Sequence, residues 1–200
     1  MLENVRFYSF LSKKNIATLL NLIFLLFVYS IAQGSEKIKI INNFNTLNTL
    51  KFDFTQKSFD NEENGVCYLK RPYFFKCLYK DKNQKELIIN NRVLVIYHKR
   101  YNKIYRYPLS KSYFMDILNR EKFSKLIMDG ESFLNSNYIE IKYRDINKGK
   151  ISLFFDKSNF NLLGWELIDI NNNVTILEIK NYLKNIEINK NFFLIPEENQ

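Results

Sequence analysis

Few residues of this chain have the types and spacing that catalysis requires. His98 is the single histidine, which excludes most histidine-based triads and any metal site built from several histidines. Cys67 and Cys77 have no second cysteine pair, which is a poor zinc pattern. The sequence also has no glycine-rich phosphate loop. These observations favour a binding protein over a nucleotide- or metal-dependent enzyme.

The carboxylates provide no catalytic pair either. Glu62-Glu63 and Glu197-Glu198 are adjacent in sequence and fall in expected loop or tail segments, which indicates a solvated surface. Asp169 falls within an expected strand, and nothing near it in the sequence would raise its pKa toward that of a general acid. We therefore predict no catalytic residues, no metal, no cofactor and no enzymatic activity.

Residues 65–79, with the sequence GVCYLKRPYFFKCLY, predict a β-hairpin. Two apolar runs flank Arg71-Pro72-Tyr73, and proline at the second position of a tight turn favours strands at 66–70 and 74–79 over a helix. Side chains of paired strands alternate between two faces. The predicted register places Lys70 and Lys76 on a hydrated face. The apolar face then carries Cys67, Leu69, Arg71, Phe75, Cys77 and Tyr79.

The same hairpin carries a family resemblance. Lys70-Arg71-Pro72 is followed by the aromatic pair Phe74-Phe75, Phe54-Thr55-Gln56 lies upstream, and the chain closes with FFLIP at 192–196. In this succession the sequence resembles the periplasmic outer-membrane lipoprotein carrier proteins, the LolA family. Each motif is short, so the strength of the likeness lies in their order along nearly the whole chain after its N-terminal segment.

The resemblance implies an incomplete β-barrel whose hydrophobic cavity is closed by helices and receives the acyl chains of lipoproteins. Arg71 matches the family arginine that holds the lid and is needed for handing cargo on, and Phe75 matches the aromatic residue that governs cargo acceptance. Leu69 shares their face of the hairpin. The expected cargo-binding set is completed by the lid-helix positions Phe114, Met115 and Ile117. The chain departs from the family pattern at Tyr113, where proline is frequent, and at Cys77, where an aromatic residue is common.

Arg71 is expected to control release of cargo. Its guanidinium would donate hydrogen bonds to backbone carbonyls of the lid, and so favour a closed, empty state that cargo must displace. Arg71→Leu would then load cargo but fail to release it.

The expected partners also follow from the resemblance. They are acylated lipoproteins and the inner-membrane lipoprotein-releasing ABC transporter, and the existence of a dedicated outer-membrane lipoprotein receptor is left open. The protein would act as a monomeric chaperone in outer-membrane biogenesis. Its formal net charge of +9 would favour acidic partners or anionic headgroups. We find no concentrated basic stripe with spaced aromatic residues, so we predict no nucleic-acid partner.

The N-terminal residues predict export. Arg6, Lys13 and Lys14 precede an apolar run at 16–29, and Ser30-Ile31-Ala32 offers small residues for signal peptidase. We predict a signal peptide over residues 1–32, cleaved after Ala32, and a soluble periplasmic domain over 33–200; an uncleaved anchor is the alternative. In that oxidising compartment Cys67 and Cys77, which face each other in the hairpin, form either a disulfide or two buried thiols.

The rest of the pattern predicts an α+β fold that is mainly β. A curved antiparallel sheet of roughly nine to eleven strands would form a half-open barrel. Amphipathic helical spacing occurs at 36–47 and 111–128, with Ser110 or Ser112 as an N-cap, and these helices would cover the concave face. Residues 60–65 are expected to form a polar turn. The expected strands beyond the hairpin are 50–54, 86–90, 92–98, 104–107, 139–143, 151–155, 162–170, 174–180 and 192–195.

A concave sheet beneath helices, in a chain with 16% aromatic residues, encloses either a long apolar ligand or an ordinary filled core. We interpret the chain as a lipoprotein carrier. The alternative is a periplasmic lipid-sensing domain on the same half-barrel that signals through a partner. A hydrolase acting on lipids is a third and weaker interpretation.

Overall fold

The computed structural model describes residues 20–23, 35–59, 61–91 and 93–197. The chain divides into two units, Met1–Ile38 and Lys39–Gln200. In the first unit residues 20–23 are helical, and the predicted cleavage site after Ala32 lies outside the described residues. No helix within the described ranges is long and apolar enough to cross a membrane. The β-sheet belongs to the second unit.

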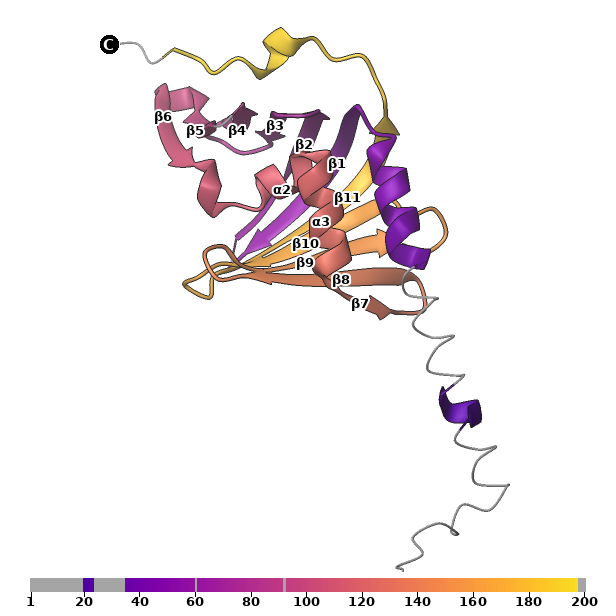
Figure 1. Cartoon of the computed structure of the whole chain (residues 1–200). Helices are drawn as coiled ribbons and strands as arrows, with labels where there is room; N and C mark the ends of the chain where they lie inside the picture. The colour runs from indigo at the N-terminus through magenta and orange to yellow at the C-terminus, as the bar shows by residue number, and fades with distance from the viewer. Residues whose placement is uncertain (1–19, 24–34, 60, 92, 198–200) are drawn as a thin grey trace, which may run out of the picture. The chain divides into compact units, whose positions relative to one another are not determined.

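The described strands of the second unit form one open antiparallel sheet of eleven strands (Figure 1). The order across the sheet is β6-β5-β4-β3-β2-β1-β11-β10-β9-β8-β7, so β1 and β11 are the one neighbouring pair that is not consecutive in sequence. The prediction of a mainly β fold with an incomplete barrel is confirmed. The bounds are β1 Thr49–Ser58, β2 Asn61–Lys70, β3 Phe74–Tyr79, β4 Lys85–Asn90, β5 Val93–His98, β6 Lys103–Pro108, β7 Glu131–Leu134, β8 Tyr138–Asp145, β9 Gly149–Asp156, β10 Leu162–Ile168 and β11 Val174–Lys184.

The two edge strands, β6 and β7, follow each other in the sequence, so the segment between them crosses the open side of the sheet. This segment contains α2 (Phe114–Leu118) and α3 (Arg120–Asp129). Asn119 has extended backbone and separates the two helices, and its side chain accepts a hydrogen bond from the N–H of Lys122. Ser112 Oγ accepts a hydrogen bond from the N–H of Phe114 at the start of α2. We call α2 and α3 the lid.

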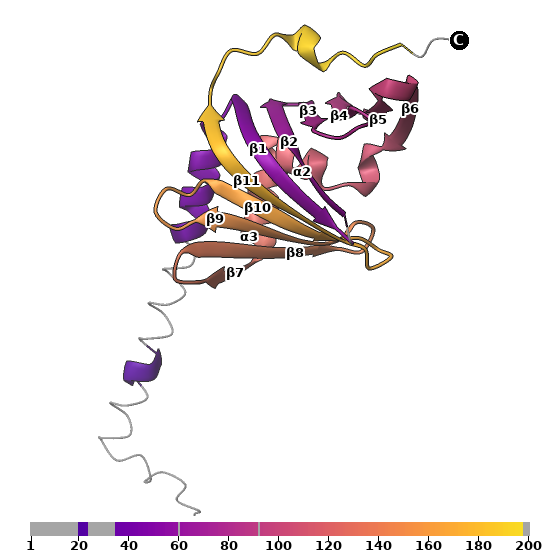
Figure 2. The same ribbon diagram turned by 180° about the vertical axis from the view of Figure 1, so that it is seen from behind.

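Residues 35–45 are also helical, and the part that belongs to this unit, 39–45, covers the same face of the sheet as the lid. Figure 2, which views the molecule from behind, shows the sheet in front of all three helices. Ile40, Phe44 and Leu47 are buried at the spacing that predicted this helix. The predicted helical cover over the concave face is therefore confirmed.

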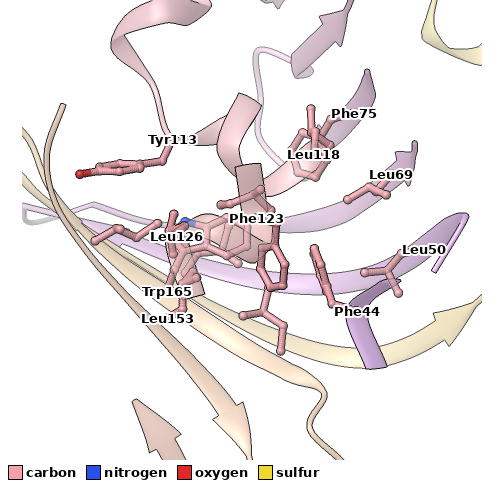
Figure 3. Packing of buried hydrophobic residues seen from close by; sticks show 14 of the residues in the cluster. Phe44, Leu50, Leu69, Phe75, Tyr113, Leu118, Phe123, Leu126, Leu153 and Trp165 are labelled. Carbon is pink, nitrogen blue, oxygen red and sulfur yellow. The ribbon is translucent and has the colours of Figure 1, made fainter. Parts of the chain in front are cut away.

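The main core lies between the sheet and these helices (Figure 3). Phe123 of α3 is central to it, because its ring stacks on that of Phe44 and meets that of Phe155 of β9 edge-on. The distances between ring centres are 3.8 Å and 6.4 Å. Figure 3 shows Phe75 beside Leu118 of α2, and Trp165 close to Leu153 and Leu126. The lid thus packs on the sheet through large apolar side chains.

The hairpin of β2 and β3 has the predicted register, with Cys67 opposite Cys77 and Leu69 opposite Phe75. Its second face is not the hydrated surface that we expected. The C-terminal segment covers part of it. The ring centres of Phe192 and Tyr68 lie 4.7 Å apart, and those of Phe193 and Phe74 lie 5.5 Å apart.

This covering segment contains a short 3₁₀ helix, η3 (Lys190–Phe193), where the sequence predicted a last strand. Phe193 is fully buried, and its carbonyl accepts a hydrogen bond from Asn90 Nδ2. Ile88 and Val95 on the outer face are also fully buried. The prediction of a strand at 192–195 is wrong because these residues pack flat on the outside of β3 and β4 instead of joining the ladder.

Two further expectations need correction. The segment 61–65 is not a turn, since β2 begins at Asn61 and pairs with Ser58 of β1. The sequence pattern also missed β7, a four-residue edge strand that pairs with β8.

Candidate functional site

An apolar pocket of about 260 Å³ opens on the concave side of the sheet. Its walls come from β1, β3, β4, β5, β10 and β11, and from one lid residue. The lining residues are Gln56, Phe75, Cys77, Tyr79, Lys85, Leu87, Ile96, Phe114, Trp165, Leu167, Thr175 and Leu177. We call this space the outer chamber.

A second space lies deeper, beneath the lid, and has a volume of only about 10 Å³. We call it the inner chamber. Its walls are Phe44, Leu50, Phe52, Leu69, Phe75, Phe114, Ile117, Leu118, Leu162 and Trp165. All of them are apolar, and native side chains fill the space. Well-filled apolar interiors of this kind are ordinary core packing.

Three aromatic residues line both chambers: Phe75, Phe114 and Trp165. The rings of Phe75 and Phe114 lie 5.4 Å apart, so a residue of β3 contacts the first residue of α2. These side chains divide a continuous apolar hollow into an open part and a filled part. Movement of α2 away from the sheet would join the two parts.

The predicted cargo-binding residues fall into three groups. Leu69, Phe75, Phe114 and Ile117 line one or both chambers. Met115 packs against the core without lining either chamber. Arg71 lies next to the inner chamber and lines neither.

Several lining residues were absent from the predicted set, including Trp165, Leu87, Ile96 and Leu177. The sequence marked Ile96 and Leu87 as apolar strand residues. Their membership of one pocket depends on the curvature of the sheet, which brings β4 and β5 opposite β10 and β11. The sequence offers one reason to consider Trp165 as a pocket residue, because it is the single tryptophan of the chain.

Arg71 has an unusual environment at the tip of the hairpin. Its guanidinium lies 4.2 Å from the centre of the Phe44 ring. Its Nε, Nη1 and Nη2 atoms are all buried, and none of them has a hydrogen-bond partner among the described residues. Burial lowers the pKa of Arg71 to about 10, the neighbouring Arg120 contributes to the lowering, and Tyr182 acts in the opposite direction. The expected hydrogen bonds from Arg71 to lid carbonyls are absent, so that prediction is wrong.

Arg120, the first residue of α3, makes the type of contact that we expected of Arg71. Its Nη2 atom donates to Asn48 Oδ1 at 2.7 Å and to the carbonyl of Leu47 at 3.4 Å. The N–H of Arg71 donates to the carbonyl of the same Asn48 at 2.9 Å. Asn48 therefore connects the lid to the tip of the hairpin.

The lid has two more polar tethers at α2. Tyr113, which precedes α2, donates a hydrogen bond from its hydroxyl to the carbonyl of Gly149 at 2.9 Å. Asp116 forms an ion pair with Lys148, and both side chains are largely buried, with exposed fractions of 15% and 17%. Both partners lie at the turn between β8 and β9. Polar contacts thus stabilise the lid in its closed position.

The mouth of the outer chamber has its own polar group. Tyr79 donates from its hydroxyl to Gln56 Oε1 at 3.1 Å, and the ammonium group of Lys85 lies 3.8 Å from the centre of the Tyr79 ring. Lys85 also pairs with Glu63. Burial, with the nearby Glu63 and Asp81 carboxylates, raises the pKa of Tyr79, so the phenol is neutral at ordinary pH.

Cys67 and Cys77 are joined in a disulfide, one of the two states that the sequence left open. Cys67 is fully buried, and Cys77 forms part of the wall of the outer chamber. The bond therefore fixes β2 to β3 directly behind the pocket.

The other surfaces of the described chain are less suited to a ligand than the outer chamber. A larger, open cleft of about 460 Å³ is lined mainly by charged residues of both signs, including Lys142, Arg144, Lys150 and Glu166. Such a surface suits water better than an apolar ligand. The described residues contain no group of three or more histidine, cysteine or acidic side chains that could hold a metal ion.

Comparison with solved structures shows the same fold elsewhere. An uncharacterized conserved protein from Thermus thermophilus matches with a TM-score of 0.53 and 10% identity, over 84% of this chain and 96% of that one. A LolA superfamily protein from Nitrosomonas europaea matches with a TM-score of 0.41 and 12% identity, over 78% and 96%. A chain of the MucA/MucB complex from Pseudomonas aeruginosa matches with a TM-score of 0.49 and 10% identity, over 84% and 62%. At this identity the Thermus match shows a shared fold and nothing about function.

Comparison with curated proteins finds no match. The family model described as "Outer membrane lipoprotein carrier protein LolA" matches residues 45–196, from the end of the first helix to the C-terminal segment. This match covers the sheet, the lid and both chambers. The chain belongs to the LolA family of outer membrane lipoprotein carrier proteins.

Proposed function

We propose that the protein is a soluble periplasmic carrier that takes the acyl chains of lipoproteins released by an inner-membrane ABC transporter and delivers them to the outer membrane. The observation that carries this proposal is the outer chamber, an apolar pocket that ends at three aromatic side chains beneath the lid. Family membership supports the same interpretation.

The outer chamber alone is small for a long acyl chain. Pockets that enclose small ligands usually measure about 300–1,000 Å³, whereas the outer chamber measures about 260 Å³. A long acyl chain would therefore need the inner chamber as well. Displacement of Phe114, Ile117 and Leu118 with α2 would supply that volume.

Such a carrier must bind strongly and still release its cargo. Each methylene removed from water contributes about 0.8 kcal/mol, so a chain of about a dozen carbons gains roughly 10 kcal/mol on entering the pocket. A stable closed state competes with cargo, because the filled inner chamber must be emptied before a chain enters. The tethers from Arg120, Tyr113 and Asp116 set the stability of that closed state.

In this account Arg71 opposes closure. A buried guanidinium without acceptors is unfavourable, and opening of the lid would expose it to water or to the carbonyl groups at the base of the acyl chains. Arg71 would thus favour the loaded state through these carbonyls, while Arg120 favours the empty state.

Native mass spectrometry of the protein recovered from the periplasm tests the proposal. Ile96→Trp would fill the outer chamber, since Ile96 is a lining residue. Val93→Trp is the matched control, because Val93 is a partly exposed residue of the same strand that does not line the pocket. We expect bound acylated protein with the wild type and with Val93→Trp, and much less with Ile96→Trp.

Two results would contradict the carrier function. Absence of any acylated protein in the wild-type complex would do so, as would equal loading of the two tryptophan variants. A bound free lipid, without acylated protein, would instead support the lipid-sensing alternative.

A further inference from the structure

The free edge of the sheet at β6 combines exposed tyrosines with exposed basic residues. Tyr101, Tyr105 and Tyr107 have exposed fractions of 57%, 46% and 48%. Lys99, Arg100 and Lys103 are also exposed, and none of the three forms an ion pair within the described ranges. Figure 1 shows β6 at one end of the sheet, with β7 at the other. We call these six residues the β6 edge.

The charge of this region has one sign over a long stretch of sequence. No aspartate or glutamate occurs between Glu86 and Asp116, whereas that interval contains six lysines and arginines: Arg92, Lys99, Arg100, Lys103, Arg106 and Lys111. The expectation that the chain has no basic stripe with spaced aromatic residues overlooked this interval. Asp81 lies in the turn whose carbonyls accept from the N–H groups of Lys99 and Arg100, but the three basic side chains of the β6 edge outnumber it, so the edge attracts anions.

The register of β5 and β6 connects this edge to the outer chamber. Ile96, which lines the chamber, is opposite Tyr105, and Leu94 of the main core is opposite Tyr107. Directly opposite residues of an antiparallel pair share one face of the sheet. Tyr105 and Tyr107 therefore continue the pocket face outward to the free edge.

We propose that the β6 edge is a docking surface for an anionic phospholipid membrane, which places the mouth of the outer chamber at the lipid surface. Tyrosine is favoured at membrane interfaces because one end of the ring is apolar and the other is polar. Lysine and arginine near an anionic bilayer each contribute attraction. A nucleic acid would use the same charges but has no use for the adjoining apolar pocket. The inference depends on the proposed function for its purpose, but membrane binding is measurable without cargo.

Co-sedimentation of the protein with vesicles tests the inference. The vesicles are pure phosphatidylcholine, or equimolar phosphatidylcholine and phosphatidylglycerol. We expect binding to the anionic vesicles that weakens as salt is added, and little binding to the neutral ones. The combined substitution of Lys99→Gln, Arg100→Gln and Lys103→Gln would lower the partition coefficient by about 100-fold.

The matched control removes the same charge elsewhere. Lys150, Lys157 and Lys180 are exposed and lie on β9, on the turn that follows it and on β11. Their combined change to glutamine should reduce binding far less than the change at the β6 edge. A third variant combines Tyr101→Ser, Tyr105→Ser and Tyr107→Ser. At high salt, where charge is screened, it should bind the anionic vesicles more weakly than the wild type does.

The proposal would be overturned by an equal loss of binding in the control variant, by absence of binding to anionic vesicles, or by binding to single-stranded DNA or a protein partner in place of vesicles. Acyl-chain binding in solution, measured on the same glutamine variants, separates the two proposals. Lost vesicle binding with intact acyl binding supports the β6 edge and leaves the carrier function standing. A wild-type protein that binds vesicles but no acyl chain contradicts the carrier function alone.

Discussion

The guanidinium of Arg71 lies 4.2 Å from the centre of the Phe44 ring, and within the described part of the chain none of its three nitrogens has a hydrogen-bond partner. Phe44 belongs to the helix that covers the concave face, so this contact joins the hairpin tip to the helical cover. A cation over an aromatic face gains about 2 kcal/mol when desolvated, which does not offset the cost of burying a charge without acceptors. Burial of Arg71 is therefore expected to lower the stability of the fold.

Arg71→Met should stabilise the empty protein. The methionine keeps an unbranched apolar side chain beside Phe44 and removes the buried charge, so the free energy of unfolding should rise by about 1 kcal/mol. Arg120→Met should lower it by a similar or greater amount, because Arg120 donates to Leu47 and Asn48. Urea unfolding measures both, and a comparable loss of stability in the two variants would show that Arg71 supports the fold.

Asp116→Asn should increase the apparent affinity for an acylated peptide. The change removes the ion pair with Lys148 that holds α2 closed. Loss of about 1 kcal/mol from the closed state would lower the apparent dissociation constant by about fivefold. Fluorescence titration with the peptide gives the value.

Asp129→Asn provides the control for this change. Asp129 pairs with Lys125 within α3, and both side chains are substantially exposed, so this variant should bind like the wild type. Unchanged or weaker binding by Asp116→Asn would contradict a lid that competes with cargo.

The free energy of unfolding should decrease in alkaline solution because Tyr113 is buried. Burial raises the pKa of Tyr113 to about 12 from the usual 10.0. The folded state then keeps the phenolic proton at pH values where the unfolded state loses it. The stabilisation is complete below about pH 10 and is lost as the pH rises through about 12.

Tyr113→Phe should be less stable at neutral pH, by about 1 kcal/mol, because the hydrogen bond to Gly149 is lost. Its stability should also decline less steeply than that of the wild type across the alkaline window. Urea unfolding at a series of pH values compares the two slopes. Parallel curves would mean that the Tyr113 hydroxyl is hydrated in the folded protein.

Reduction of the disulfide should weaken the hairpin behind the outer chamber. Cys67 and Cys77 are separated by 10 positions, and closure of a loop of this size stabilises a protein by about 2–3 kcal/mol. The variant with Cys67→Ala and Cys77→Ala should therefore unfold at lower temperature than the oxidised wild type. Intact mass before and after reduction should differ by two hydrogen atoms, whereas two titratable thiols in the native protein would contradict the bond.

The sequence predicted those parts of the fold in which local pattern and tertiary packing agree. The β2–β3 register followed from alternation about Pro72, and the first helix followed from the spacing of Ile40, Phe44 and Leu47. The polar residues Asn61–Gly65 gave no strand signal, because β2 gains its pairing there from β1 and has little apolar surface to bury. Phe192–Ile195 looked like a strand, since apolar runs do not indicate whether a segment joins a sheet or lies across it.

The candidate site was predicted less completely than the fold. Phe75, Phe114 and Ile117 were assigned to the hollow from the family pattern, and Leu69 from its face of the predicted hairpin. The opposite wall, with Trp165 and Leu177, depends on the pairing of β1 with β11, a contact between distant parts of the sequence. Arg120 was missed because its role depends on its position opposite Asn48, which no spacing in the sequence indicates.

The most direct test uses Trp165, the single tryptophan of the chain. Its side chain is only 4% exposed and lines both chambers. A peptide with a brominated acyl chain should quench its fluorescence on binding, because bromine quenches by contact, and the same peptide with an unbrominated chain should not. If the brominated chain binds with the same affinity but leaves Trp165 emission unchanged, acyl chains do not enter the space between the sheet and α2, and the account is wrong.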